Sequence, residues 1–160
     1  MQNRAMAATT PAPIISRAAL AGHPLHPMMI HFPVAALIGL VGTDAAYLWG
    51  GDPFWARAGL WLAGVGALGG WGASAVGLVD LLSVKGIRRL VTAWAHALLA
   101  VMMLSLASFN WMIRLGENPG ALVLPWGAGL SLLTALFIGL AAYLGGRLVY
   151  EHAVGVDTSD

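Results

Sequence analysis

Four of the five histidines are the side chains in this sequence best suited to chemistry. His23, His26 and His31 stand together in the segment GHPLHPMMIHFP, and His96 stands alone in an apolar segment. An imidazole can ligate a metal ion or haem iron and can exchange a proton near neutral pH. What these four side chains can do depends on the elements that hold them.

The composition places those elements in a lipid bilayer. Of the 160 residues, 59% are hydrophobic and 9% are charged, whereas roughly 25% of residues are charged in soluble domains. Four apolar stretches, each about the 20 residues that cross a hydrocarbon core, cover residues 28–49, 57–82, 91–113 and 125–148. We expect an all-α membrane protein: a flexible N-terminal arm (residues 1–20), one four-helix transmembrane bundle (residues 21–153) and a C-terminal tail (residues 154–160).

The basic residues predict the orientation of the bundle. Six of them fall on the arm, the loop after the second stretch and the tail: Arg4, Arg17, Lys85, Arg88, Arg89 and Arg147. Segments rich in lysine and arginine stay on the cytoplasmic side, so both termini are expected in the cytoplasm. The net charge of +1 gives no reason to expect a nucleic-acid partner, and the absence of cysteine excludes disulfides and thiolate ligands.

Depth and helix register favour one pair of histidines. With the amino terminus inside, His31 and His96 lie at a similar depth near the cytoplasmic ends of the first and third helices. Each shares a helix face with small residues, which let helices approach closely in lipid. Because an ionisable side chain inside a membrane span is costly, such a residue indicates a function. The two imidazoles are therefore predicted to face each other across the bundle.

Two aspartates in the spans also need partners, because a buried carboxylate without one is strongly destabilising. Asp80 ends the second span at the depth of the histidines. It is predicted to accept a hydrogen bond from an imidazole or to pair with an arginine at that end of the bundle. The candidates are Arg88, Arg89 and Arg147. For Asp44, near the other end of the first span, we expect a pair with Arg57 or Arg114.

Four strings together resemble a known family: GHPLHPMMIHFP, GLVDLL, TAWAHALLAV and the terminal GGRLVYEHAVGV. From Gly22 to Val156 the chain is similar to the bacterial membrane family called domain of unknown function 2231. The resemblance implies a multi-pass protein of the bacterial inner membrane. Some members are joined to Rieske-type or cytochrome-type electron carriers, which implies a redox setting. The residues that match the motifs are His23, His26, His31, Asp80 and His96.

One chemistry for this set is a b-type haem. Such a haem needs two neutral imidazoles from facing helices, room for a flat macrocycle, and cations near its propionates. His31 and His96 would ligate the iron, and the small-residue helix faces would leave the room. The cations near that depth are Lys85, Arg88 and Arg89. This interpretation makes the protein a redox subunit of a membrane electron-transfer system, closer to a carrier than to an enzyme.

A bare transition-metal ion is the alternative. Imidazole and carboxylate are ligands for zinc, copper or iron. The candidate ligands are His23, His26, His31, His96 and Asp80. The sequence has no HExxH motif, no carboxylate in helical register with a histidine and no serine paired with a base, so we predict no catalytic residue.

A third alternative needs no cofactor. Glycine and alanine at four-residue spacing, as at Gly66 and Gly70, could dock the bundle on partner membrane subunits or on a second copy of the chain. The protein would then be an accessory subunit of a larger membrane complex. A transporter is the least expected function, because four short helices show no recognisable inverted repeat.

Overall fold

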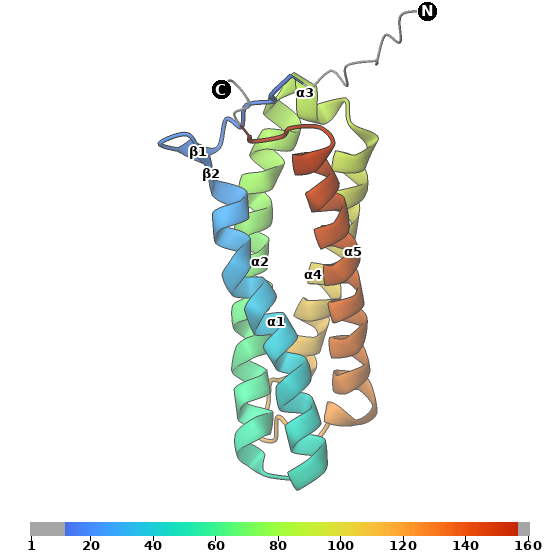
Figure 1. The fold of residues 1–160 in the computed structure, drawn as a ribbon. Coiled ribbons are helices and arrows are strands. Elements are labelled where there is room, and N and C mark those ends of the chain that lie inside the picture. The colour runs from blue at the N-terminus through green and yellow to red at the C-terminus, as the bar shows by residue number, and fades with distance from the viewer. Residues whose placement is uncertain (1–11, 157–160) are drawn as a thin grey trace, which may run out of the picture.

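The computed structural model describes residues 12–156, which fold as a bundle of four long helices (Figure 1). These are α1 (Leu25–Gly50), α2 (Pro53–Ser83), α4 (Val91–Arg114) and α5 (Ala128–Tyr150). The short elements are β1 (Ala19–Leu20), β2 (His23–Pro24), α3 (Lys85–Arg88) and the π-helical turn η1 (Val123–Gly127). β1 and β2 pair antiparallel, with Leu20 beside His23.

In the described part of the chain, these four helices are long and apolar enough to cross a membrane, which confirms the four predicted spans. Their ends differ from the predicted stretches by a few residues. The difference matters at α1, which begins at Leu25 and not near Met28. The turn that follows α1 has a local cause. Gly51 ends the helix with a left-handed φ of 67°, and the Asp52 side chain accepts a hydrogen bond from the backbone N–H of Phe54 to cap α2.

The four helices form a square in which α1 and α4 occupy opposite corners. α1 packs against α2 and α5, and α4 packs against the same two helices. Both α1 and α4 begin at the end of the bundle where α3 lies, which we call the α3 end (Figure 1). The two described chain ends meet there as well. The backbone N–H of Ile14 donates to the carbonyl of Ala153 at 3.0 Å, and that of Gly155 donates to the carbonyl of Ile14 at 2.8 Å.

Residues 12–18 belong to the segment expected to be a flexible arm, but the structure fixes them at the α3 end. Ser16 is buried, and the backbone N–H of Leu25 donates to the carbonyl of Ala18 at 2.8 Å. Residues 1–11 of the expected arm, with Arg4, lie outside the described residues. The part of the arm next to α1 is therefore a packed element of the bundle.

The small residues of α2 accept large side chains from both neighbouring helices. A Cβ atom added at Gly66 would lie 2.5 Å from the Leu37 side chain of α1, and one at Gly70 would collide with Leu104 of α4. These contacts build the main core cluster. Its buried residues are Leu37, Leu40, Ala63, Ala67, Met103, Leu104, Ala107 and Ile138. The predicted small-residue faces thus pack helices within the bundle, where close approach replaces the hydrophobic driving force that lipid removes.

A second apolar cluster closes the α3 end. Its buried residues are Leu81, Ile87 and Ala93. Side chains from the arm, the tail and the helix ends pack against them, namely Ile14, Val84, Leu90, Ala97, Leu148 and Val154. The bundle therefore has apolar packing in its middle and at the α3 end.

A buried ion pair joins the diagonal helices α1 and α4 toward the end opposite α3. Arg114 donates from Nη1 to Oδ1 of Asp44 at 2.7 Å and from Nη2 to Oδ2 at 2.8 Å. The Ser131 hydroxyl donates to the same carboxylate at 2.6 Å, and Asn110 accepts from Nε of Arg114 at 3.0 Å. Arg114 is 1% exposed and Asp44 is 3% exposed. The predicted pairing of Asp44 is confirmed, with Arg114 as the partner.

Replacing Asp44→Leu is expected to lower the free energy of unfolding by about 3–5 kcal/mol, because it leaves a buried guanidinium without its counter-ion. Unfolding in detergent micelles, followed by circular dichroism, measures the change. The double variant D44L/R114M should recover much of the loss, because it removes both charges together. Glu117→Gln, in an exposed loop at the same end, is the control. A stability of Asp44→Leu equal to that of Glu117→Gln would contradict a structural role for the pair.

The distribution of basic residues predicts that the α3 end faces the cytoplasm. A periplasm-active reporter fused after Asp160 should therefore be inactive, and the same reporter fused after Asn118, in the loop between α4 and η1, should be active. The opposite pattern would reverse the orientation while leaving the bundle unchanged.

Candidate functional site

Two histidines from diagonal helices meet inside the half of the bundle nearer the α3 end. The ring centroids of His26 on α1 and His96 on α4 lie 6.1 Å apart, and the ring planes stand at 88° to each other. Both side chains are half-buried. They come from near the first turns of α1 and α4, which both start at the α3 end. Among the described residues, His26 and His96 are the two histidine rings that contact each other.

Each imidazole is held by a backbone carbonyl of an adjacent helix. Nδ1 of His26 lies 2.8 Å from the carbonyl oxygen of Ala73 on α2. Nδ1 of His96 lies 2.9 Å from the carbonyl oxygen of Ala141 on α5. A carbonyl can only accept, so each Nδ1 carries the hydrogen and, in the neutral ring, Nε2 keeps its lone pair. This tautomer is the one in which a histidine ligates a metal through Nε2.

A glycine follows each of these alanines by four residues, and at Gly77 the missing side chain leaves the room that the imidazole needs. Gly77 stands four residues after Ala73, and a Cβ atom there would lie 2.9 Å from Nδ1 of His26. Gly145 stands four residues after Ala141, and a Cβ atom there would lie 3.5 Å from Cε1 of His96. Residues four apart share a helix face. Each ring therefore lies on an alanine carbonyl and next to a glycine of the same helix face, closely at Gly77 and in ordinary contact at Gly145.

The predicted pairing of His31 with His96 is wrong, and His26 takes its place. His31 is exposed, and its Nδ1 lies 3.3 Å from the carbonyl of Met28 in its own helix. Residues 26 and 31 of one helix point about 140° apart, because each residue turns the helix by about 100°. α1 begins early enough to include His26, so His26 faces the bundle and His31 faces outward. His23 is also exposed, in β2, with Nδ1 2.9 Å from the carbonyl of Ala21.

The wider ligand set expected for a bare metal ion is not brought together. Within residues 12–156, no group of three or more histidine, aspartate or glutamate side chains is placed to hold a metal ion. Asp80 is turned toward the arm and not toward a histidine. Its carboxylate accepts hydrogen bonds from the Ser16 hydroxyl and from the backbone N–H groups of Arg17 and Ala18, at 2.8 and 2.9 Å. The predicted partners of Asp80, an imidazole or an arginine, are therefore replaced by the arm.

The basic residues expected near haem propionates lie at the α3 end. Lys85 and Arg88 belong to α3, Arg89 follows it, and all three are exposed. Arg88 donates from Nη1 to the carbonyl of Leu82 at 3.1 Å. Arg147, near the end of α5, donates hydrogen bonds to the Glu151 carboxylate and forms an ion pair with it. These hydrogen bonds and the positive charge of Arg147 lower the pKa of the Glu151 carboxyl below its ordinary value.

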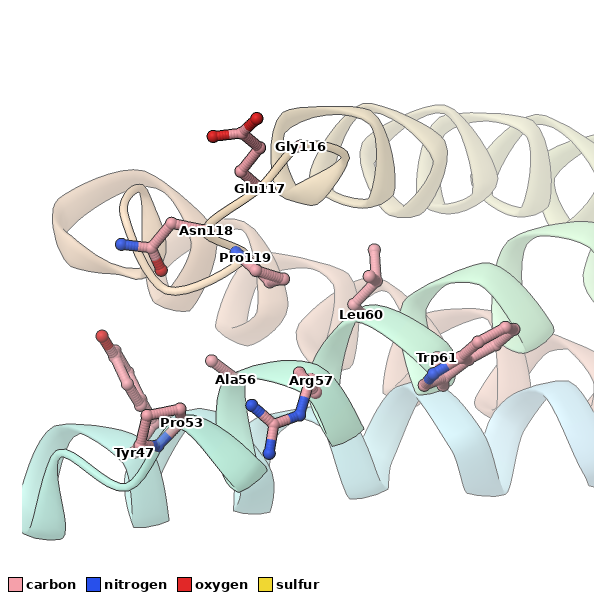
Figure 2. Close-up of a pocket in the computed structure, with 10 residues that line it drawn as sticks. All are labelled: Tyr47, Pro53, Ala56, Arg57, Leu60, Trp61, Gly116, Glu117, Asn118 and Pro119. Carbon is pink, nitrogen blue, oxygen red and sulfur yellow. The ribbon is translucent and has the colours of Figure 1, made fainter.

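A separate cavity of about 440 Å³ lies at the end of the bundle opposite α3. Figure 2 shows it between the start of α2, with Arg57, and the loop that carries Glu117 and Asn118. The Glu117 carboxylate points away from α2 in this view. The polar side chains around the cavity do not converge on a common point, and the histidine pair lies toward the other end of the helices. The histidine pair is therefore the better candidate site.

A family model described as predicted membrane protein (DUF2231) matches residues 22–158 of the chain. The match includes His26, His96 and both alanine–glycine supports. No curated protein matches the chain, and no solved structure matches it.

The support by Gly77 predicts a position-specific effect. Gly77→Ala is expected to displace the His26 ring and to destabilise the bundle by about 1–3 kcal/mol, as overpacking does. Gly72→Ala on the same helix is the matched control, because nothing lies within 4 Å of a Cβ atom there. Thermal unfolding measures stability, and ¹⁵N spectra of the imidazoles report the Nδ1 hydrogen bond. Equal unfolding temperatures and equal imidazole spectra of the two variants would show that the His26 ring does not need the space left by Gly77.

Proposed function

The chain belongs to the DUF2231 family of predicted membrane proteins, and we propose that its histidine pair binds one b-type haem. In this proposal His26 and His96 would hold the haem, and His31 would not. The protein is then an electron carrier of a membrane redox system, with no catalytic side chain of its own. The observation that carries the proposal is the spacing of the two imidazoles.

The spacing fits a metal centre between the two rings. A bond from a metal to an imidazole nitrogen is about 2.0–2.1 Å long, so two opposite bonds separate the nitrogens by about 4 Å. Each ring centroid lies about 1 Å behind its nitrogen, which gives a centroid separation of about 6 Å for two such ligands. The observed separation of His26 and His96 is 6.1 Å. Both Nδ1 atoms are already bonded to carbonyls, so Nε2 is the free ligand atom in each ring.

The number of ligands favours haem over a bare ion. A structural zinc ion takes four ligands, and a catalytic zinc ion takes three from the protein. The described residues bring two imidazoles together, without a third ligand group near them. A haem needs only two axial ligands, because the porphyrin supplies the other four nitrogens. The helices α1 and α4 lie diagonally across the bundle and pack mainly on α2 and α5, so the two histidines reach each other from opposite sides, as two ligands of one haem would.

The protein's own residues perform three tasks in this proposal. The carbonyls of Ala73 and Ala141 fix the tautomer and orientation of the ligands. The apolar clusters in the middle of the bundle and at the α3 end exclude water, and the exposed cations of α3 lie at the end where propionates would be neutralised. Bound there, haem supplies one-electron transfer, with a potential set by its axial ligands, hydrogen bonds and burial.

An electron carrier also needs a donor and an acceptor in or at the membrane. Gly72 on α2 and Gly139 on α5 are exposed, and nothing lies within 4 Å of a Cβ atom at either position. A neighbouring helix could approach both faces closely. The proposal therefore includes partner subunits or a second copy of the chain as neighbours of the bundle. It places the protein in the bacterial inner membrane.

An accessory subunit without a cofactor is the second candidate. Its supporting observation is that the two rings stand edge to face at 6.1 Å, within the range of about 4.5–7 Å that ordinary aromatic contacts occupy. In that case the histidines only pack the helices, and replacing either one affects stability without any change in bound groups.

Visible spectra of the protein from haem-supplied cells test the proposal. Wild type is expected to show a Soret band and reduced α and β bands, and His26→Ala and His96→Ala are expected to lose them. His31→Ala and His23→Ala, which change exposed imidazoles, should keep them. Addition of free imidazole to His96→Ala should restore part of the spectrum, which separates a lost ligand from a lost fold.

Two results would contradict haem binding. Wild type with no Soret band but with about one copper or zinc ion per chain would favour the metal-ion alternative. Wild type with neither haem nor metal would leave the accessory subunit. Loss of the spectrum in His31→Ala, with retention in His26→Ala, would restore the pair expected from the sequence.

A further inference from the structure

We propose that residues 12–24 form a lid over the α3 end of the bundle, fastened by Asp80, which controls access from that side to the histidine pair. The sequence placed Asp80 among the possible ligands, whereas the structure uses it to hold the arm. That the lid controls a bound group rests on the proposed function. The lid itself is independent of what the histidines bind.

Asp80 is built into the bundle as an acceptor for this segment. It lies near the end of α2 and is 8% exposed. Its Oδ1 accepts from the backbone N–H groups of Arg17 and Ala18, and its Oδ2 accepts from the Ser16 hydroxyl. Hydrogen bonds to a charged acceptor are stronger than those between neutral groups. Among the described polar side chains of α2, Asp80 alone bonds to the arm, so it is the fastening point.

The rest of the lid is held by apolar contact and by backbone bonds to the tail. Ile14 packs on the cluster formed by Leu81, Ile87 and Ala93. A Cβ atom at Gly86 would lie 3.0 Å from the Ile14 side chain, so the glycine allows the close fit. Ile14 also forms a parallel bridge with Val154. Figure 1 shows the arm and the tail crossing the same end of the bundle.

The lid is connected directly to both histidines. Asp80 stands three residues after Gly77, which adjoins the His26 ring. On α4, Ala93 belongs to the cluster that Ile14 packs against and stands three residues before His96. The lid continues through β1 and β2 into α1, whose second residue is His26. Opening the lid would therefore uncover the apolar cluster that adjoins, at the α3 end, the turns of α2 and α4 that carry Gly77 and His96.

The chain has no cysteine, so single cysteine reporters test the lid cleanly. Ala93→Cys places a thiol in the cluster that Ile14 packs against, where the alanine is 4% exposed. Ala107→Cys places one in the main core of the same helix, where the alanine is 0% exposed. The rate of labelling by a water-soluble maleimide is measured for the full chain in detergent, with Asp80 intact and with Asp80→Ala. Asp52→Ala, which removes a carboxylate cap at the other end of α2, is the matched control.

Asp80→Ala is expected to speed labelling at position 93 roughly ten- to hundredfold, because loss of hydrogen bonds to a charged group shifts the opening equilibrium by about that factor. Labelling at position 107 should stay slow, and Asp52→Ala should change neither rate. Ser16→Ala should give a smaller increase at position 93, because both backbone bonds to Asp80 remain.

Two outcomes would overturn the lid. Unchanged labelling at position 93 in Asp80→Ala would show that Asp80 does not fasten the arm. Parallel increases at positions 93 and 107 would show that Asp80 stabilises the whole bundle and not a separable lid. Neither readout involves haem, so a wild type without a Soret band but with a released lid would refute the proposed function and leave the lid standing.

Discussion

The constraint that organises this structure is that a polar side chain inside the spanning helices must find its partner within the protein. Hydrocarbon offers no hydrogen bonds, so each unpaired group is strongly destabilising. The bundle meets the constraint at three levels. Asp44 binds Arg114 toward one end, the two imidazoles bind carbonyls in the other half, and Asp80 binds the arm at the α3 end. Among the described residues, the hydroxyls of Ser83 and Thr134 are buried without a partner.

Features that depend on composition or on the spacing within one helix could be predicted from the sequence. The four spans follow from apolar length, and the small residues of α2 pack helices as their spacing indicated. The partner of Asp44 was narrowed to two arginines, because few cations lie near that end. In each case the prediction tolerates an error of a few residues, since neither a span nor a pair of long side chains needs an exact helix start.

The histidine pair could not be predicted in the same way, because it depends on where α1 begins. A start at Leu25 puts His26 inside the helix, on a face about 140° from that of His31. The role of Asp80 was missed for a different reason. Its partners lie more than sixty residues earlier in an arm without hydrophobic periodicity, so nothing local connects them. The small-residue row that contains Ala73 and Gly77 was visible in the sequence. Only the structure shows that it lets the His26 ring reach the Ala73 carbonyl.

The supports of the two imidazoles repeat along the chain. In the hairpin of α1 and α2, a histidine near the start of the first helix bonds an alanine carbonyl beside a glycine of the second, and the hairpin of α4 and α5 does the same. Each hairpin thus supplies one histidine of the site together with the carbonyl that holds it. Each histidine is accompanied by its own support, so a cut in the chain at α3 divides the protein into two complete half-sites and leaves each ligand with the carbonyl that orients it.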